Sequence, residues 1–258
     1  RIQEDAVVHV LQYAPITEEL RSEVLTDQKA LKEAGAFAFT NDGVGVQTAG
    51  TMYLAMKEAA KNQMALVAHT EDDSLLFGGV MHAGKRAAEL GLPGILSATE
   101  ASQIARDVLL AEETGAHYLR GRADREALIE GLLDGTIDCI ATDHAPHGYD
   151  EKMQSFLKAP FGIVGSEYAF QLIYTHFVKT GRFTLQQAVA WMTEKPAEIF
   201  GLKAGRLMVG APADLAIFDL ETAYTVDSDQ FLSKGKNTPF NNWPLYGDTT
   251  HTLVNGKL

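Results

Sequence analysis

Three side chains that can bind divalent metals each follow a short apolar run in the sequence. Asp42 comes shortly after the run that ends at Thr40, His69 ends the run ALVAH, and Asp143 ends the run IDCIATD. In a barrel of parallel strands, side chains at the carboxyl ends of the strands converge above the barrel axis. Imidazole nitrogen and carboxylate oxygen suit zinc or a similar divalent ion. The pattern therefore predicts a metal site that takes one ligand from each of three strands.

Each of these residues also has a purely structural interpretation. Asp42 precedes Gly43 and could simply make a turn, and His69 could be a histidine whose hydrogen bonds are satisfied in the core. Residues 142–147, TDHAPH, are more specific, because a carboxylate and two imidazoles follow a buried run in close succession. His144 keeps a structural interpretation, since adjacent side chains at the end of a strand point in opposite directions.

The elements that would carry these residues alternate between strands and helices, which is typical of an α/β fold with a parallel sheet or barrel. The apolar runs predict strands at residues 7–14, 35–40, 65–69 and 137–143. Helical spacing predicts crossover helices through Met52, Ala55, Met56 and Ala59, through Leu128, Ile129, Leu132 and Leu133, and at residues 102–115 and 185–200. Gly115 is suited to cap the third of these helices.

The pattern changes in the last part of the chain. Residues 213–220, 224–226 and 251–256 are short strand-like runs separated by turns. We therefore expect two parts, a barrel-like domain at residues 1–200 and a small β domain with a tail at residues 201–258.

Composition limits the classes of function. The chain is 46% hydrophobic and carries a net charge of −12, which disfavours nucleic acid and anionic membrane surfaces as partners. Its single cysteine, Cys139, excludes an internal disulfide framework and a cysteine-rich zinc site. No run of eighteen apolar residues occurs, and residues 1–14 lack the features of a signal peptide, so we expect a cytoplasmic protein.

Several segments together resemble one family of enzymes. They are AFAFTNDGVGVQTA, ALVAHTEDDSLLFGG, HAGKRAAELGLPG, ADREALIEGLLDGTIDCIATDHAPH and KAPFGIVGSE. These segments are similar to the bacterial class I dihydroorotases of the amidohydrolase superfamily, and the resemblance covers nearly the whole chain. Hydantoinases, dihydropyrimidinases and allantoinases share the aspartate at the last barrel strand but usually lack the Ala-Pro-His that follows it here. His147 therefore favours a dihydroorotase.

The resemblance implies a fold, a reaction and a set of metal ligands. The fold would be an amidohydrolase (β/α)8 barrel of the TIM type with a small C-terminal β appendage. The reaction would be the reversible hydrolysis of the cyclic amide of dihydroorotate to N-carbamoyl-aspartate, in pyrimidine synthesis. Asp42 would bridge two zinc ions, His69 would bind the second, and Asp143 would be a metal ligand and the proton shuttle. A metal-bridging hydroxide would attack the ring carbonyl.

The resemblance also implies how the substrate is bound and which proteins are partners. His147 would bind the substrate carboxylate, and the loop with Phe161 and Gly162 would cover the dihydroorotate ring. A homodimer and a complex with aspartate transcarbamoylase are the protein partners that the family implies.

Two parts of the family pattern are absent from this sequence. The family's first barrel strand ends in a metal-binding His-x-His pair followed by an arginine for the substrate carboxylate, and neither is present. Residues 115–118, GAHY, resemble the start of a strand that delivers another histidine, yet they run directly into residues 119–122, LRGR. We therefore expect missing segments before Arg1 and between Tyr118 and Leu119, and too few strands to close a barrel. Three ligand candidates remain of about six, so zinc would be absent or depleted in this chain.

Two alternatives remain open at this point. The chain could be a non-catalytic dihydroorotase-like subunit, a shortened paralogue that supports aspartate transcarbamoylase, in which case it would bind no catalytic metal. It could also be a related cyclic amidase that acts on a hydantoin or on allantoin, although His147 weighs against that interpretation.

Overall fold

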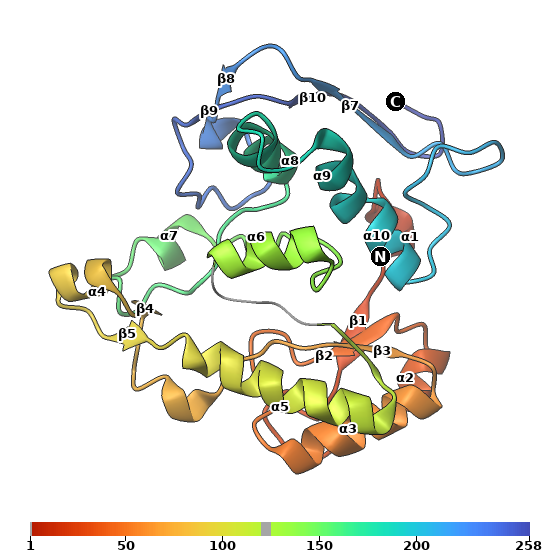
Figure 1. The fold of residues 1–258 in the computed structure, drawn as a ribbon, viewed down its shortest axis with the longest axis vertical. Helices are drawn as coiled ribbons and strands as arrows, with labels where there is room; N and C mark the ends of the chain where they lie inside the picture. Colours follow the sequence, from red (N-terminus) through yellow and green to blue (C-terminus); the bar gives the residue numbers. More distant parts are fainter. Residues whose placement is uncertain (1, 120–124) are drawn as a thin grey trace. The chain divides into compact units, whose positions relative to one another are not determined.

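A four-stranded parallel sheet organises the first half of the chain (Figure 1). Its strands lie in the order β1 (Tyr13–Pro15), β2 (Ala38–Thr40), β3 (Ala65–Val67) and β6 (His117–Leu119). Because all four strands are parallel, their carboxyl ends lie at the same edge of the sheet. The strands predicted at residues 35–40 and 65–69 are thus confirmed with shorter bounds. The strand predicted at residues 7–14 begins only at Tyr13.

The computed structural model describes residues 2–119 and 125–258, which form two compact units, Arg1–Glu130 and Gly131–Leu258. Residues 120–122, which follow shortly after the segment expected to be missing between Tyr118 and Leu119, lie outside the described residues. Within the described residues, no helix is both long and apolar enough to cross a membrane.

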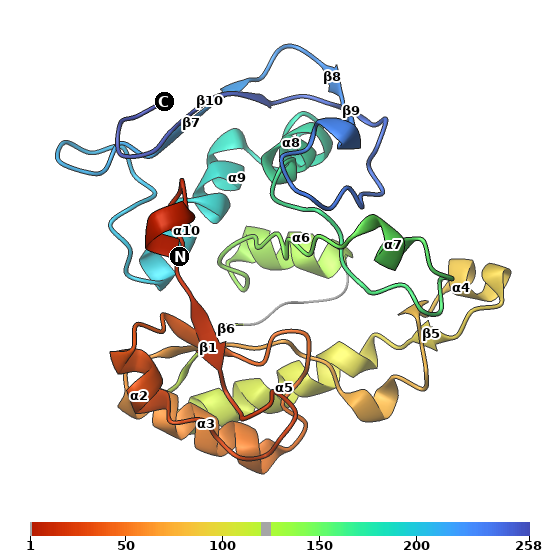
Figure 2. The same cartoon turned by 180° about the vertical axis from the view of Figure 1, so that it is seen from behind.

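Two long helices, α3 (Ala49–Lys61) and α5 (Ala98–Thr114), lie side by side in the first unit and contact the sheet (Figures 1 and 2). The Thr48 side chain caps α3 by accepting a hydrogen bond from the N–H of Thr51. The apolar face predicted for α3 is confirmed, because four of its side chains are at most 1% exposed and pack with the strands: Met52, Ala55, Met56 and Ala59. Gly115 ends α5 in the left-handed conformation, as predicted.

The other elements of the first unit are short. They are α1 (Ile2–Asp5), α2 (Gln28–Glu33), η1 (Asp73–Leu75), α4 (Lys85–Leu90) and the parallel pair β4 (Met81–His82) and β5 (Gly94–Ile95). The helix α6 (Arg125–Asp134), also predicted, spans the boundary between the units.

The second unit contains short helices and two antiparallel strand pairs, and Tyr168, which is 2% exposed, lies in a core cluster with Val164, Val226 and Leu245. Its helices are α7 (Tyr149–Lys152), α8 (Ala169–Ile173), η2 (Tyr174–Val178), α9 (Leu185–Met192), α10 (Glu194–Ile199) and η3 (Ser228–Gln230). Its strand pairs are β7 (Leu215–Asp219) with β10 (Asp248–Leu253), and β8 (Tyr224–Thr225) with β9 (Pro244–Leu245). The short strands expected in the tail are therefore present. The domain division at residues 200 and 201 stays a prediction.

Two predicted elements of the second unit were wrong. Residues 137–143 do not form a strand, because their backbone bonds to non-strand partners: Ile137 N–H donates to Gly131, and Ile140 N–H donates to Trp191. The single helix expected at residues 185–200 is two helices that meet at Thr193. A proline inside a helix removes a hydrogen bond and clashes with the preceding turn. The chain starts a new helix instead, so that Pro196 lies in its first turn.

Candidate active site

Asp42 lies in the loop that leaves the carboxyl end of β2, and its neighbour Asn41 fixes that loop. Asn41 is 2% exposed, and its Oδ1 accepts hydrogen bonds from the N–H groups of Ile16 (2.9 Å) and Thr17 (3.1 Å). Its Nδ2 donates to Thr17 Oγ1 (2.7 Å) and to the carbonyl oxygen of Leu20 (2.8 Å). The amide therefore uses its full bonding capacity inside the protein, which fixes the backbone beside Asp42 while the Asp42 side chain stays exposed.

The next part of that loop is bound by Arg106 of α5. The guanidinium donates to the carbonyl oxygens of Val46 (2.8 Å) and Gln47 (2.9 Å), and its Nε donates to Asp107 Oδ1 (2.7 Å). The Asp107 side chain is fully buried and the Arg106 side chain is 20% exposed. Charge-assisted hydrogen bonds of this kind are the stronger ones in proteins, so α5 sets the course of the loop after Asp42.

The segment after His69 is bound by the same helix. The N–H of Glu71 donates to Gln103 Oε1 (3.1 Å), and the Glu71 carbonyl accepts from Gln47 Nε2 (2.9 Å). Gly45 packs against this carbonyl so closely that an added Cβ would lie 2.4 Å from the Glu71 oxygen. The loop that carries Asp42 and the segment that carries His69 are therefore joined to each other and to α5.

Glu100, in the first turn of α5, lies close enough to His69 for their charges to interact. Partial burial raises the pKa of the Glu100 carboxyl above its usual value of 4.5, and the charge of His69 acts in the opposite direction. The sequence pattern does not single out Glu100, because a glutamate near the start of a helix is ordinary and its nearness to His69 arises only in the folded chain.

The metal ligands expected from the sequence are divided between the two units. Asp42 and His69 follow the adjacent strands β2 and β3, and a carboxylate oxygen and an imidazole nitrogen fit a zinc site chemically. Across residues 2–119 and 125–258, no three His, Cys, Asp or Glu side chains gather as a metal-binding group. Asp143 lies in the second unit, so its convergence with Asp42 and His69 stays a prediction.

Asp143 begins a loop with an unusual backbone conformation. Its φ is 43°, in the left-handed region that few residues other than glycine, asparagine and aspartate adopt. The next residue, His144, has a structural role, because its Nδ1 accepts hydrogen bonds from the N–H groups of Gly165 (3.1 Å) and Ser166 (3.2 Å). The structure thus supports the structural interpretation of His144 and leaves Asp143 exposed at the loop.

His147 connects this loop to the loop that contains Phe161. His147 Nε2 lies 2.6 Å from the Phe161 carbonyl oxygen, and since a carbonyl can only accept, the ring nitrogen donates. His147 Nδ1 lies 3.8 Å from Glu151 Oε2. The Phe161 side chain is 66% exposed. The residues proposed from the sequence to bind substrate are therefore brought together in the second unit.

Gly162 permits the close approach of the two loops. Its φ is 114°, and an added Cβ would lie 2.6 Å from the Cβ of Ala145. Lys152, at the end of α7, donates to the carbonyl oxygens of Pro160 (2.8 Å) and Gly162 (3.2 Å). Lys152, which was not among the site residues expected from the sequence, brings a positive charge to the loop after Pro160.

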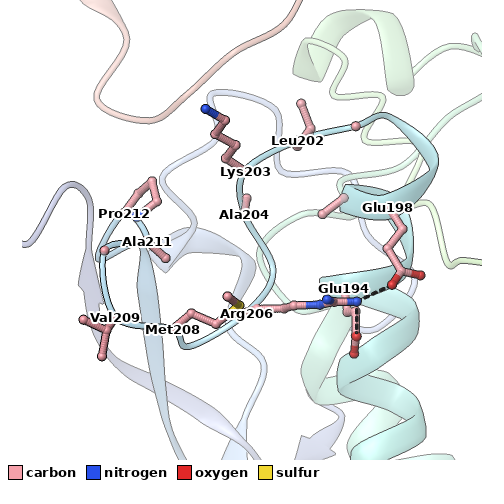
Figure 3. A pocket seen from close by; sticks show the side chains of 13 residues that line it. Glu194, Glu198, Leu202, Lys203, Ala204, Arg206, Met208, Val209, Ala211 and Pro212 are labelled. Atoms are coloured by element: carbon pink, nitrogen blue, oxygen red, sulfur yellow. Dashed lines mark hydrogen bonds and ion pairs between the residues drawn. The ribbon is translucent and has the colours of Figure 1, made fainter.

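One cavity of the second unit is lined by residues outside these loops. It has a volume of about 740 Å³ and is lined by α10 and residues 201–212. Arg206 is one of the lining residues and forms ion pairs with Glu194 (2.7 Å) and Glu198, as Figure 3 shows. None of the site residues predicted from the sequence lines this cavity, so we do not assign the reaction to it.

Comparisons with known proteins point to one family. A family model described as dihydro-orotase-like matches residues 1–122. The dihydroorotase of Enterococcus faecalis is 63% identical over 309 aligned residues, which cover the whole chain and 72% of that protein. The dihydroorotase of Bacillus caldolyticus is 53% identical over 310 residues, with 73% of its length covered. Both alignments are longer than the 258 residues of this chain, so these relatives contain residues without a counterpart here.

Solved structures show the same fold at low identity. An L-hydantoinase from Arthrobacter aurescens matches 96% of this chain and 69% of its own, with a TM-score of 0.78 and 23% identity. A D-hydantoinase from Bacillus sp. AR9 matches 98% of this chain and 70% of its own, with a TM-score of 0.77 and 18% identity. The expected α/β fold class is thereby confirmed, and the described residues of the first unit form a four-stranded parallel sheet.

Proposed function

We propose that Asp143, His147 and Phe161 act on the ring of dihydroorotate, because the chain belongs to the dihydroorotase family. The reaction of that family is the reversible hydrolysis of dihydroorotate to N-carbamoyl-aspartate. The observation that carries the proposal is the hydrogen bond between His147 Nε2 and the Phe161 carbonyl. It joins the loop that follows Asp143 to the loop expected to cover the substrate.

Asp42, His69 and Asp143 would bind a divalent metal, with two zinc ions in the complete ligand set. The support is chemical, because these side chains offer the nitrogen and oxygen donors that zinc prefers, and Asp42 and His69 follow adjacent strands. When bound, the metal would lower the pKa of water and polarise the ring carbonyl.

Asp143 would move the proton that the reaction requires. Hydrolysis breaks the bond between the ring carbonyl carbon and the ring nitrogen, while the oxygen of water bonds to the carbon and the nitrogen gains a proton. One carboxylate can accept the proton from water and then deliver it to the departing nitrogen. The exposed position of Asp143 at the start of its loop leaves the carboxylate accessible for both transfers.

His147 would bind the carboxylate of dihydroorotate, and the loop with Phe161 and Gly162 would cover the ring. With Nε2 donating to the Phe161 carbonyl, His147 Nδ1 could donate to the substrate carboxylate only in the protonated ring, in which both ring nitrogens are donors, and the substrate would meet Glu151 Oε2 3.8 Å from the same nitrogen. The exposed Phe161 ring supplies apolar surface, which would shield the substrate from water once it is covered.

Several wider features of the function stay predictions. A role in pyrimidine synthesis, a cytoplasmic location, a homodimer and a complex with aspartate transcarbamoylase follow from the family resemblance. Activity of the metal-loaded protein separates an enzyme from a non-catalytic subunit.

The test is turnover in both directions, with dihydroorotate and with N-carbamoyl-aspartate, after a chelator has removed metal and zinc has been added back. We expect activity to follow the zinc content measured by elemental analysis, and dihydroorotate to be preferred over a hydantoin. Full activity in the metal-free protein would overturn the metal assignment. Preference for a hydantoin would overturn the substrate assignment.

A further inference from the structure

Asn237 lies about ninety residues after the TDHAPH segment, yet its side chain binds both loops of the proposed substrate site. Its Oδ1 accepts a hydrogen bond from the backbone N–H of His147 (3.0 Å). Its Nδ2 donates to the carbonyl oxygen of Gly162 (3.0 Å) and, at a longer distance, to that of Ala145 (3.4 Å). One amide therefore bridges the loop of His147 and the loop of Gly162.

This bridge needs a group that accepts and donates at the same time. The amide of asparagine has one oxygen acceptor and an NH₂ donor, whereas a carboxylate at neutral pH has only acceptors. A carboxylate in this place could still accept from the His147 N–H, but it would face the carbonyl oxygens of Ala145 and Gly162 without a proton to offer. The geometry thus selects asparagine rather than aspartate.

The backbone around Asn237 is itself fixed. The Asn237 carbonyl accepts from the N–H of Val164 (2.9 Å). The next residue, Thr238, accepts a hydrogen bond from the hydroxyl of the buried Tyr168 (2.7 Å). The amide of Asn237 is therefore presented to the two loops from a rigid part of the second unit.

Close packing leaves little room for the loop of His147 to shift. Gly235 is buried, and a Cβ added to it would lie 2.8 Å from the His147 carbonyl oxygen and 2.8 Å from the Cβ of Pro146. A Cβ on Gly162 would lie 3.1 Å from His147 Nε2. The segment that contains Asn237 is thus in contact with the backbone of His147 on one side, and Gly162 packs against its ring on the other.

We propose that Asn237 is a positioning residue for substrate binding, which acts by fixing the His147 ring relative to the Phe161 carbonyl; this inference rests on the proposed role of His147. A carboxylate ligand is bound well only if its donor is already in place. Loss of the bridge would therefore weaken the binding of dihydroorotate more than it would slow the chemical step.

The test compares Asn237→Asp with a matched control, Asn241→Asp, in the full-length zinc-loaded enzyme. Asn241 lies in the same segment of the tail, and its Oδ1 accepts from the N–H of Ser228 (2.9 Å), away from both loops. Asn237→Asp should raise KM for dihydroorotate by roughly tenfold while kcat changes by less than about threefold. The reason is that the hydrogen bonds from the Asn237 amide to the carbonyl oxygens of Gly162 and Ala145 are lost. Asn241→Asp should leave both constants unchanged.

Two further variants keep the outcome decisive. The side chain of Asn237→Ser is too short to bridge the two loops, and the variant adds no charge. It replaces Asn237→Asp in the test if Asn237→Asp does not fold, and it too should raise KM. His147→Ala is measured in parallel. A raised KM in His147→Ala together with a normal KM in the Asn237 variants would overturn the role of Asn237 alone. A normal KM in His147→Ala would overturn the proposed role of His147 and the inference with it.

Discussion

His147 Nε2 donates a hydrogen bond to the carbonyl oxygen of Phe161 across 2.6 Å, and so a histidine from one loop binds the backbone of the next. The bond fixes the ring orientation, and the second ring nitrogen, Nδ1, lies 3.8 Å from Glu151 Oε2. This hydrogen bond therefore joins two loops that are only partly supported by regular secondary structure.

Replacing His147 by alanine should weaken dihydroorotate binding while leaving the fold intact. The side chain is bound to a backbone carbonyl and to no buried apolar cluster, so its loss removes a contact to the substrate carboxylate rather than a part of the core. A hydrogen bond to a charged group contributes about 2 kcal/mol, so kcat/KM should fall by roughly 30-fold. Steady-state kinetics with circular dichroism would check this, and unchanged kinetics would remove the strongest support for substrate binding here.

Gly162→Ala should lower both stability and turnover. At a φ of 114° an alanine is strained, and its Cβ would lie 2.6 Å from the Cβ of Ala145. We expect a loss of about 2 kcal/mol in the free energy of unfolding, together with a displaced loop. Gly181→Ala is the matched control, because Gly181 also has a positive φ of 76° but an added Cβ would meet nothing within 4 Å. Equal effects of the two variants on turnover would show that the contact with Ala145 does not matter.

Arg106→Gln should destabilise the first unit strongly. The variant loses the two hydrogen bonds to the loop after Asp42 and removes the cation beside the fully buried Asp107. Breaking a buried charge pair from one side costs about 3 kcal/mol. Arg86→Gln is the control, since Arg86 pairs with Glu89 on an exposed helix surface and should change stability by less than about 0.5 kcal/mol. Chemical denaturation of both variants tests the difference.

Glu100 should make stability depend on pH in a defined direction. Burial raises the pKa of its carboxyl in the folded protein, so the folded state favours the protonated form. Its contribution to stability is therefore fully present below the unfolded value of 4.5, and it is lost as the pH rises through the folded pKa. Glu100→Gln should be more stable than the parent protein at neutral pH, with the advantage vanishing in acid. Denaturation at several pH values would show this, and a constant difference would contradict it.

Local patterns in the sequence predicted the local parts of the fold. The helical spacing of Met52, Ala55, Met56 and Ala59 identified the buried face of α3, and Gly115 marked the end of α5. Both signals are local, because a helix buries one face and ends where a residue can adopt a positive φ.

Contacts between distant segments were not predictable in this way. Residues 137–143 are as apolar as a strand, but their backbone bonds to residues of two helices, α6 and α9. Asn237 and Glu100 have no distinguishing neighbours in the sequence, and their importance follows from contacts made only in the folded chain. For the same reason the sequence suggested the roles of His147 and Phe161 but not the hydrogen bond that joins them.

Asp143→Asn should separate metal binding from proton transfer, the two functions that we propose for this residue. The amide has nearly the same size and keeps one oxygen donor for a metal, but it cannot accept a proton at neutral pH. Asparagine also tolerates the left-handed conformation of residue 143, where φ is 43°, so the loop should keep its course.

Turnover in Asp143→Asn should therefore fall by about 1000-fold, which is within the usual contribution of general acid and base catalysis, while zinc binding weakens only in part. The measurement is elemental analysis of the full-length protein alongside turnover in both directions with added zinc. Asp138→Asn is the control, because Asp138 is an exposed carboxylate five residues earlier that we assign no role, and it should retain normal turnover. If Asp143→Asn binds zinc and keeps most of its activity, another residue of the loop must transfer the proton.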